Sequence, residues 1–325
     1  MKTISELIDF YYNVLLHDLK ELEKRREKIA GKLKRVIYII IAVSVVIIFS
    51  IYILNENRID DRLINISISL IAVAAGIYAY FYKRYTKNYN ENFKEKIIKK
   101  LIHFIDPSLR YEKRAYVPKN YFLTSALFRQ TPDRYGGNDF VNGKIGKTEI
   151  MFSDLHAEYK TTDSKGRTHY HTIFQGLFFV ADFNKKLMGK TVVLPDTAQK
   201  LFGFAGTFLQ SINRSKGELV KLDDPAFEKE FVVYSSDQIE ARYILTHSLM
   251  KRVLDFKRKR KAPLYLSFVG NKIFIAIDYR KDLFEPAVFS SLLDFETAKE
   301  YVENLQLAVS VVEDLNLNRR IWSKK

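Results

Sequence analysis

Residues 36–54 read VIYIIIAVSVVIIFSIYIL and residues 63–82 read LINISISLIAVAAGIYAYFY, and neither stretch contains a charged side chain. The two stretches are 19 and 20 residues long. An α-helix rises about 1.5 Å per residue, so each stretch spans roughly 30 Å, the thickness of a bilayer's hydrocarbon core. A buried helix of a soluble protein is the alternative, but two neighbouring runs of spanning length favour a pair of transmembrane helices.

Only residues 55–62 separate the two runs, so the spans are predicted to form a tight antiparallel hairpin. That loop carries two basic residues, whereas the flanks 20–35 and 83–100 carry eight and seven. Lys and Arg stay on the cytoplasmic side during insertion. The sequence therefore predicts a multi-pass protein of the inner membrane with both termini cytoplasmic. A cleaved signal peptide fits poorly, because a second span follows the first at once.

Apolar helical stripes flank the hairpin on both sides. The stripe within residues 1–35 consists of Ile4, Leu7, Ile8, Tyr11, Leu15, Leu19 and Leu22, and the stripe within residues 83–110 consists of Phe93, Ile97, Leu101 and Ile105. Spacings of three and four residues predict helices. We expect both helices to continue the hairpin into the cytoplasm and to pack together or against partner subunits. Four small residues suit close helix contact in a homo-oligomer: Ala72, Ala74, Ala75 and Gly76.

From residue 111 onward the pattern changes to short strands. Turn-forming residues lie between strand-like segments at Asn142-Gly143, at residues 163–166 and at Gly270-Asn271. Each combination is typical of a β-hairpin. Three hairpins within one region predict a mostly antiparallel sheet.

Helix signals interrupt these strands. Asp224-Pro225 is typical of a helix start, and residues 249–258 read as a basic helix. Thr297 and Glu300 have capping-box spacing and predict a last long helix that covers a sheet. The predicted fold class is therefore α+β: an N-terminal two-span transmembrane helical hairpin followed by a mostly antiparallel sheet-and-helix cytoplasmic domain over residues 111–325.

Three histidines are the candidates for a metal site. His169 and His171 are two residues apart in a predicted strand, so their side chains point to the same face. A hairpin would bring His156 nearby, with Asp154 or Glu158 as a carboxylate ligand. The alternative is that these residues belong to an exposed hairpin tip, where the histidines are solvated.

A run of five basic residues is the strongest charge feature in a chain of net charge +15: Lys257, Arg258, Lys259, Arg260 and Lys261. A tethered domain with such a run is drawn to anionic lipid, by about 1 kcal/mol for each basic residue near the surface. A solvated loop between a helix and a strand explains the run equally well. No recognised nucleic-acid module accompanies it, so nucleic acid is not expected as a partner.

The chain contains no cysteine. Disulfides, cysteine zinc sites and thiol nucleophiles are therefore excluded. The sequence also lacks a Gly-x-Ser-x-Gly elbow, a His-Glu-x-x-His pair and a dinucleotide fingerprint. It therefore nominates no catalytic residue and no cofactor.

Several longer segments, read in order, resemble one family. They are NDFVNGKIGKTEIMFSDLHAEY (138–159), FQGLFFVADFNK (174–185), VKLDDPAFEKEFVVYSSDQIEARYILT (220–246), LFEP (283–286) and EDLNLNRRIW (313–322). Together they resemble the bacterial membrane-protein family known as domain of unknown function 3137, over about residues 121–322. The resemblance implies a two-span inner-membrane protein with a cytoplasmic domain, and it implies no reaction.

These patterns favour a membrane-anchored cytoplasmic module that binds or scaffolds. Its expected partners are the bilayer itself, anionic lipid, an unidentified protein or a second copy of the chain. The alternative is a membrane-bound, metal-dependent enzyme that uses His156, His169 and His171. A transporter or channel is disfavoured, because both spans lack the ionisable residues that mark ion or substrate pathways.

Overall fold

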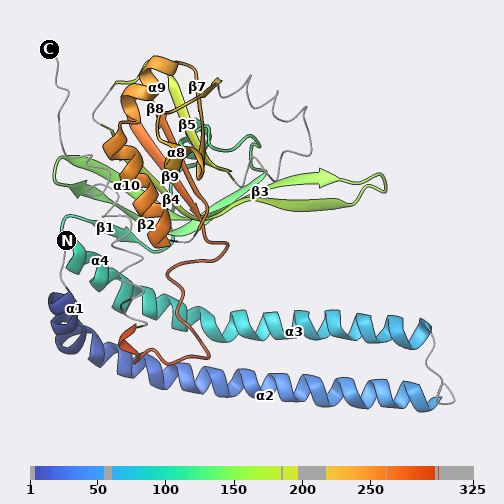
Figure 1. Cartoon of the computed structure of the whole chain (residues 1–325). Coiled ribbons are helices and arrows are strands. Elements are labelled where there is room, and N and C mark those ends of the chain that lie inside the picture. The colour runs from blue at the N-terminus through green and yellow to red at the C-terminus, as the bar shows by residue number, and fades with distance from the viewer. Residues whose placement is uncertain are drawn as a thin grey trace. The chain divides into compact units, whose positions relative to one another are not determined.

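Figure 1 shows the computed structural model of the chain. The structure describes residues 4–54, 61–183, 186–196, 217–260, 262–296 and 299. These residues form two compact units, a helical unit made of residues 4–98 with residues 285–299 and a sheet unit made of residues 99–284. The predicted α+β class is confirmed, with two long apolar N-terminal helices followed by an antiparallel sheet with helices.

Two long antiparallel helices make up most of the helical unit and lie side by side (Figure 1). The first runs from α1 (Ile4–Phe10) through a π-helical turn, η1 (Tyr11–Leu15), into α2 (Leu16–Leu54). The second consists of α3 (Asp61–Phe93) and a second π-helical turn, η2 (Lys94–Ile98). Both helices therefore extend well beyond their apolar stretches.

Each long helix is long and apolar enough to cross a membrane. No part of the most apolar 18-residue window of either helix is buried. Val46 and Ile71, for example, expose 63% and 68% of their surface. Contiguous apolar surface of this extent is rare on soluble proteins and marks contact with a membrane or another protein. The helices thus indicate membrane association.

Outside these windows the two predicted stripes are largely buried. The buried members are Leu7, Tyr11, Leu15, Leu19 and Leu22 on the first helix, Phe93 and Ile97 on the second, and Leu101 on the segment Lys99–Ile105 that follows it. Ile8 departs from the prediction and is 38% exposed. Polar contacts also join the two helices, because Lys96 pairs with Glu21 and the Lys32 ammonium lies 5.4 Å from the centre of the Tyr85 ring.

The sheet unit is built on one sheet of nine strands in the order β1-β2-β3-β4-β9-β8-β5-β7-β6. All the described pairings are antiparallel. The strands are β1 (Arg110–Glu112), β2 (Arg134–Ile145), β3 (Thr148–Thr162), β4 (Thr168–Asp182), β5 (Lys190–Pro195), β6 (Glu218–Val220), β7 (Phe231–Ser235), β8 (Leu264–Val269) and β9 (Lys272–Asp278). The helices of this unit within the described residues are α4 (Lys99–Ile105), α5 (Lys119–Thr124), α8 (Pro225–Glu228), α9 (Gln238–Ile244) and α10 (His247–Arg260).

Two of the three predicted hairpins are confirmed. The β3–β4 turn closes around Asp163, whose Oδ1 accepts hydrogen bonds from the backbone N–H groups of Lys165 and Arg167 at 2.9 and 2.8 Å. The β8–β9 turn lies at Gly270-Asn271, between Val269 and its partner Lys272. In both cases local turn chemistry and the flanking apolar pattern agree.

The predicted turn at Asn142-Gly143 is wrong. Strand β2 continues through both residues, and the turn into β3 lies at Gly146-Lys147 instead. A Cβ atom at position 143 would lie 2.8 Å from the Ser108 backbone oxygen. A glycine inside a strand can thus mark a close backbone approach instead of a turn.

The predicted helix starts have different outcomes. Asp224 caps α8 by accepting hydrogen bonds from the backbone N–H groups of Ala226 and Phe227 at 3.0 and 3.1 Å. Residues 249–258 lie within α10, as predicted. The last long helix, expected from Thr297 onward, falls almost entirely outside the described residues.

A cluster of aromatic side chains packs α5 against the sheet. Phe122 on α5 stacks on Phe128 at a centroid distance of 4.9 Å and lies 5.6 Å from Phe178 of β4. Phe128 in turn lies 5.3 Å from Phe174, also on β4. Burying each such ring contributes about 1.5–3 kcal/mol. Tyr121, the neighbour of Phe122 on α5, is partly buried and packs against the same core.

We predict that Gly176→Ala on β4 lowers the melting temperature of the detergent-solubilised chain by about 4–8 °C, as a loss of about 2 kcal/mol implies. Gly176 has φ = +153°, and an added Cβ would overlap the Ile277 backbone oxygen on the adjacent strand. Gly136→Ala on β2 is the matched control, because nothing lies within 4 Å of an added Cβ there. Equal shifts for the two variants would contradict this account.

Candidate functional site

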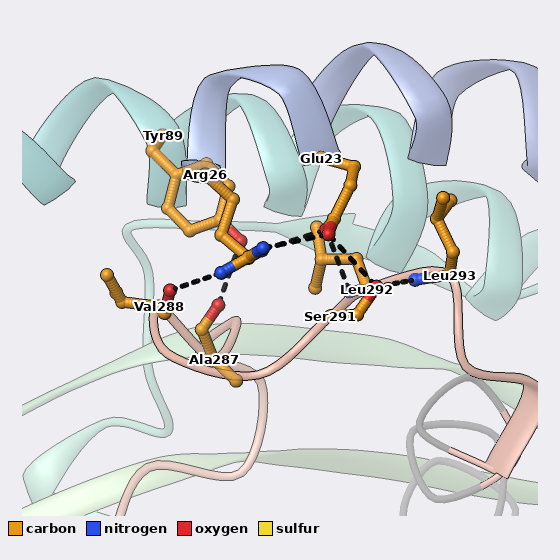
Figure 2. A network of polar contacts seen from close by, with 8 residues as sticks. All are labelled: Glu23, Arg26, Tyr89, Ala287, Val288, Ser291, Leu292 and Leu293. Carbon is orange, nitrogen blue, oxygen red and sulfur yellow. Dashed lines mark hydrogen bonds and ion pairs between the residues drawn. The ribbon is translucent and has the colours of Figure 1, made fainter. Parts of the chain in front are cut away.

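The segment that follows the sheet returns to the helical unit. We call residues 285–296 the strap; they group with the two long helices and not with the sheet that precedes them in sequence. Residues 285–294 form neither helix nor strand, so their backbone polar groups need partners from elsewhere. Figure 2 shows that side chains of both long helices supply several of these partners.

Glu23 and Arg26 on α2 form the centre of this network (Figure 2). The Glu23 carboxylate accepts hydrogen bonds from the Leu292 N–H and the Ser291 hydroxyl, both at 2.9 Å. Arg26 donates from Nε and Nη2 to the same carboxylate, and from Nη1 to the Val288 carbonyl oxygen, each at 2.9 Å. A bidentate pair of this kind fixes the orientation of both side chains. The strap is therefore bound by a charged pair that is itself held in place.

Two tyrosines extend the network to both helices. The Tyr11 hydroxyl donates to the Leu293 carbonyl oxygen at 2.8 Å. From the second helix, the Tyr89 hydroxyl donates to the Ala287 carbonyl oxygen at 3.0 Å. Because the strap bonds to residues of both helices, it stabilises their pairing as well as its own position.

The start of the strap is held by an ion pair. Glu285 pairs with Lys94 at 3.0 Å and accepts a hydrogen bond from Asn90. Lys94 lies in η2, and Tyr11 lies in η1, so both π-helical turns carry a residue that binds the strap. Such turns are rare and frequently mark functional positions.

The electrostatics favour the charged form of both central residues. Burial of Glu23 opposes its charge, but the hydrogen bonds from Arg26, Leu292 and Ser291 outweigh burial and hold its pKa below the ordinary value of 4.5. The hydrogen bond to Glu23 likewise raises the pKa of Arg26. At neutral pH the pair is therefore fully ionised. The Glu23–Arg26 pair has a structural role, because it binds the strap to the two long helices next to their apolar stretches.

Sequence reasoning did not find the strap. One signal was available in the sequence, because Glu23 directly follows the apolar stripe residue Leu22 and lies three residues before Arg26. A carboxylate at the end of an apolar stripe, one helical turn from an arginine, suggests an ion pair between the two side chains. Nothing in the local sequence of residues 285–296 indicates where that segment binds.

The structure does not gather the three predicted histidines into one site. On β3, His156 pairs with Gln175, whereas His171 pairs with Tyr159 and stacks on its ring at 5.1 Å. His169 lies near the turn, 3.6 Å from Asp163. Among the residues that the structure describes, no three His, Asp or Glu side chains converge as metal ligands. Metal binding at these histidines stays a prediction that the geometry does not favour.

The structure divides the predicted basic run. The Lys257 ammonium bonds to the Glu230 carboxylate at 2.6 Å and lowers the pKa of that carboxyl group. Lys257 also lies 4.7 Å from the centre of the Phe231 ring, so it is part of the local packing. Arg258 and Lys259 are exposed on α10. The side chains of Arg260 and Lys261 lie outside the described part of the chain.

A hollow of about 460 Å³ opens at one end of the sheet. We call it the rim pocket; its lining includes Arg110, Tyr121, Asn142, Lys144, Glu149, Met151, Val180 and Lys272. All of these residues belong to the sheet unit. The lining is therefore mixed, with charged groups, one amide, one aromatic ring and several apolar side chains.

Strand register explains why these residues meet. Arg110 pairs with Asn142, Asn142 pairs with Met151, and Met151 pairs with Val180, which makes one row across four strands. Residues directly opposite one another in neighbouring strands share a face of the sheet. The next row on that face contains the pairs Lys144–Glu149 and Asp182–Lys272. A row with one arginine, one amide and two apolar side chains thus lies beside a fully charged row at the sheet's end.

Together these features define an α+β protein with two membrane-length helices, a strap that binds them and an open pocket on its sheet. A family model described as "protein of unknown function (DUF3137)" matches residues 172–317. The resemblance drawn from the sequence is confirmed over that span.

Comparison with other proteins adds little to this match. None of the curated proteins matches the chain. Among solved structures, the "crystal structure of the mycobacterial trehalose monomycolate transport factor A, TtfA" is similar at 12% sequence identity and a TM-score of 0.32. The similarity covers 64% of this chain and 92% of that chain. A likeness this distant does not indicate a shared activity.

We predict that Glu23→Gln accelerates amide hydrogen exchange in residues 287–293 of the full chain by about tenfold or more. The variant removes a charge-assisted acceptor and leaves Arg26 without its carboxylate, at a cost of about 1.5–3 kcal/mol. Exchange would be read by mass spectrometry on the detergent-solubilised protein. The control is Glu27→Gln, because Glu27 is exposed on the same helix.

The same measurement tests the pH dependence. Because the folded pKa of Glu23 is lowered, its contribution to strap binding is fully present above about pH 4.5 and is lost as the pH falls through the lowered value. Protection at Leu292, corrected for intrinsic exchange, should therefore be constant from pH 5 to about 7 and should fall only at lower pH. An equal pH dependence in Glu23→Gln would exclude Glu23 as the titrating group.

Proposed function

We propose that this protein is a membrane-anchored binding module, which holds a sheet platform at the cytoplasmic face of a bacterial inner membrane. The observation that carries the proposal is the pair of helices whose apolar windows are entirely unburied. Such surface is stable in lipid and costly in water. The charge bias of the flanking segments supports both termini on the cytoplasmic side.

The strap favours the proposal that the helices hold the sheet unit as a platform, and do more than anchor it. Within the described residues, the chain leaves the helical unit after Ile98 and returns to it at Glu285, which gives two covalent junctions between the units. Buried hydrogen bonds to a charged pair hold the second junction. Two attachments restrict a tethered domain more than one flexible linker does.

Protein partners are proposed to bind the ribbon formed by β3 and β4. Strand β9 pairs with β4 only from Gly176 to Asp182, and within the described residues the earlier part of β4 pairs only with β3. Figure 1 shows this two-stranded ribbon projecting beyond the rest of the sheet. An open strand edge offers backbone N–H and C=O groups to an extended segment of another chain.

Anionic lipid is proposed to contact α10. Of the basic run, Arg258 and Lys259 are exposed and suit such a contact, whereas Lys257 is bonded to Glu230. Two basic residues contribute about 2 kcal/mol of attraction near an anionic surface. This is a supporting interaction, weaker than the insertion of two helices.

We predict that the anchor and its orientation can be read by cysteine labelling, since the natural chain has no cysteine. In spheroplasts, a membrane-impermeant maleimide should label Asn57→Cys in the predicted external loop at once. It should label Ser164→Cys, in the β3–β4 turn, only after the membrane is permeabilised. Both variants should stay with the membrane in alkaline carbonate. Prompt labelling of Ser164→Cys in sealed spheroplasts would overturn the proposed orientation.

The same Ser164→Cys protein tests the binding role. A photoactivatable crosslinker attached at position 164 in native membranes should give one reproducible adduct of defined mass, which is then identified. An exposed site away from the ribbon, Lys259→Cys, is the matched control and should not give that adduct. A ribbon that crosslinks only to lipid, or to a diffuse set of proteins, would count against it as the partner surface.

A further inference from the structure

The rim pocket has the size and the chemistry of a ligand site. Its volume of about 460 Å³ lies within the usual range of small-molecule sites, about 300–1,000 Å³. It is lined by rows from β1, β2, β3 and β4, with Tyr121 from α5 and Lys272 from β9. A site built on paired strands is held in place by the sheet's hydrogen bonds. The remaining question is which ligand the lining fits.

The charges of the pocket are not fully compensated. Lys272 pairs with Asp182 at 2.9 Å, and Lys144 pairs with Glu149 at 3.1 Å. In the described part of the chain Arg110 makes no ion pair, so the rim carries one net positive charge. A guanidinium presents a planar fork of donors that matches a carboxylate or a phosphate.

A second cation can join Arg110 at little cost. The Lys144–Glu149 pair is about two-thirds exposed on both sides, at 63% and 62%. Exposed ion pairs of this kind contribute only about 0–1 kcal/mol, so a bound anion competes readily for the Lys144 ammonium. Lys272 and Asp182 are less exposed, at 29% and 25%, and form the more stable pair.

The rest of the lining favours a ligand with an apolar part. Val180 lines the pocket and is almost fully buried, and Met151 lies beside it in the same row. Tyr121 adds an aromatic ring to the wall. The amide of Asn142 is the neutral polar group, and its Oδ1 is buried without a hydrogen-bond partner among the described residues. No hydrogen bond therefore fixes that oxygen, and the amide is able to turn towards a ligand.

We propose that the rim pocket binds a small organic anion, a carboxylate or phosphate that carries a flat apolar group. Arg110 and Lys144 would bind the anionic group, while Tyr121, Met151 and Val180 would contact the apolar group. This inference rests on the proposed binding role and names a ligand class for it. It involves residues of the sheet unit only and does not require membrane insertion.

The test uses the full chain in a neutral detergent and phenyl phosphate as the probe, with saturation-transfer NMR and calorimetry as readouts. Phenyl phosphate should bind saturably, and at least about tenfold more tightly than inorganic phosphate or phenol, because each of these supplies only half of the proposed contacts. Raising the salt concentration should weaken binding, since the contact is electrostatic and exposed.

Variants then locate the site. Arg110→Ala and Lys144→Ala should each weaken phenyl phosphate binding at least tenfold, whereas Arg258→Ala, at an exposed arginine on α10, should leave it unchanged. Both pocket positions are exposed, so their melting temperatures should match the parent protein. Absence of saturable binding, or equal binding by all three variants, would overturn the proposal. Carbonate resistance and cysteine labelling are independent of this pocket, so the anchoring role and the ligand site fail separately.

Discussion

The buried carboxylate of Glu23 is the interaction on which the arrangement of the helical unit depends. A segment without regular secondary structure must find partners for its backbone groups, and burial makes each unmet group costly. Glu23 satisfies the Leu292 N–H, while Arg26 satisfies the Val288 carbonyl oxygen and neutralises Glu23. Removing either side chain would leave the other charge buried without its partner. The strap is thus determined by one ion pair more than by its own sequence.

The position of this network along the helices has a physical reason. In lipid, apolar side chains gain nothing from leaving the solvent, so the hydrophobic effect does not hold two spanning helices together. In water it does, and the described helices bury their stripes at Leu15, Leu22 and Phe93, outside the apolar windows. The polar contacts of the strap lie at the same level. The association of the two helices is therefore concentrated where burial stabilises it, and their apolar windows stay exposed.

The sequence predicted those parts of the fold that depend on local signals. The apolar runs, the turn at Gly270-Asn271 and the cap at Asp224 each rest on residues close together in the chain, and the structure agrees. The prediction of a turn at Asn142-Gly143 was wrong because glycine occurs both in turns and where two backbones approach closely. Only the position of the backbone near Ser108 distinguishes the two cases. The strap was missed because its partners lie more than 190 residues away in the sequence. No local pattern carries that information.

The candidate sites also depend on contacts that the local sequence does not show, and net charge alone does not locate a binding surface. The excess of basic residues drew attention to the run that begins at Lys257, yet that lysine is bonded to Glu230. Several other lysines are likewise paired, among them Lys94 with Glu285 and Lys272 with Asp182. A cation whose ion pair is largely shielded from solvent, as at Lys94 and Lys272, contributes little to recognition, because a ligand must first displace its partner. What distinguishes the rim pocket is an arginine with no described ion pair at the edge of a concave, partly apolar surface, and strand register placed it there.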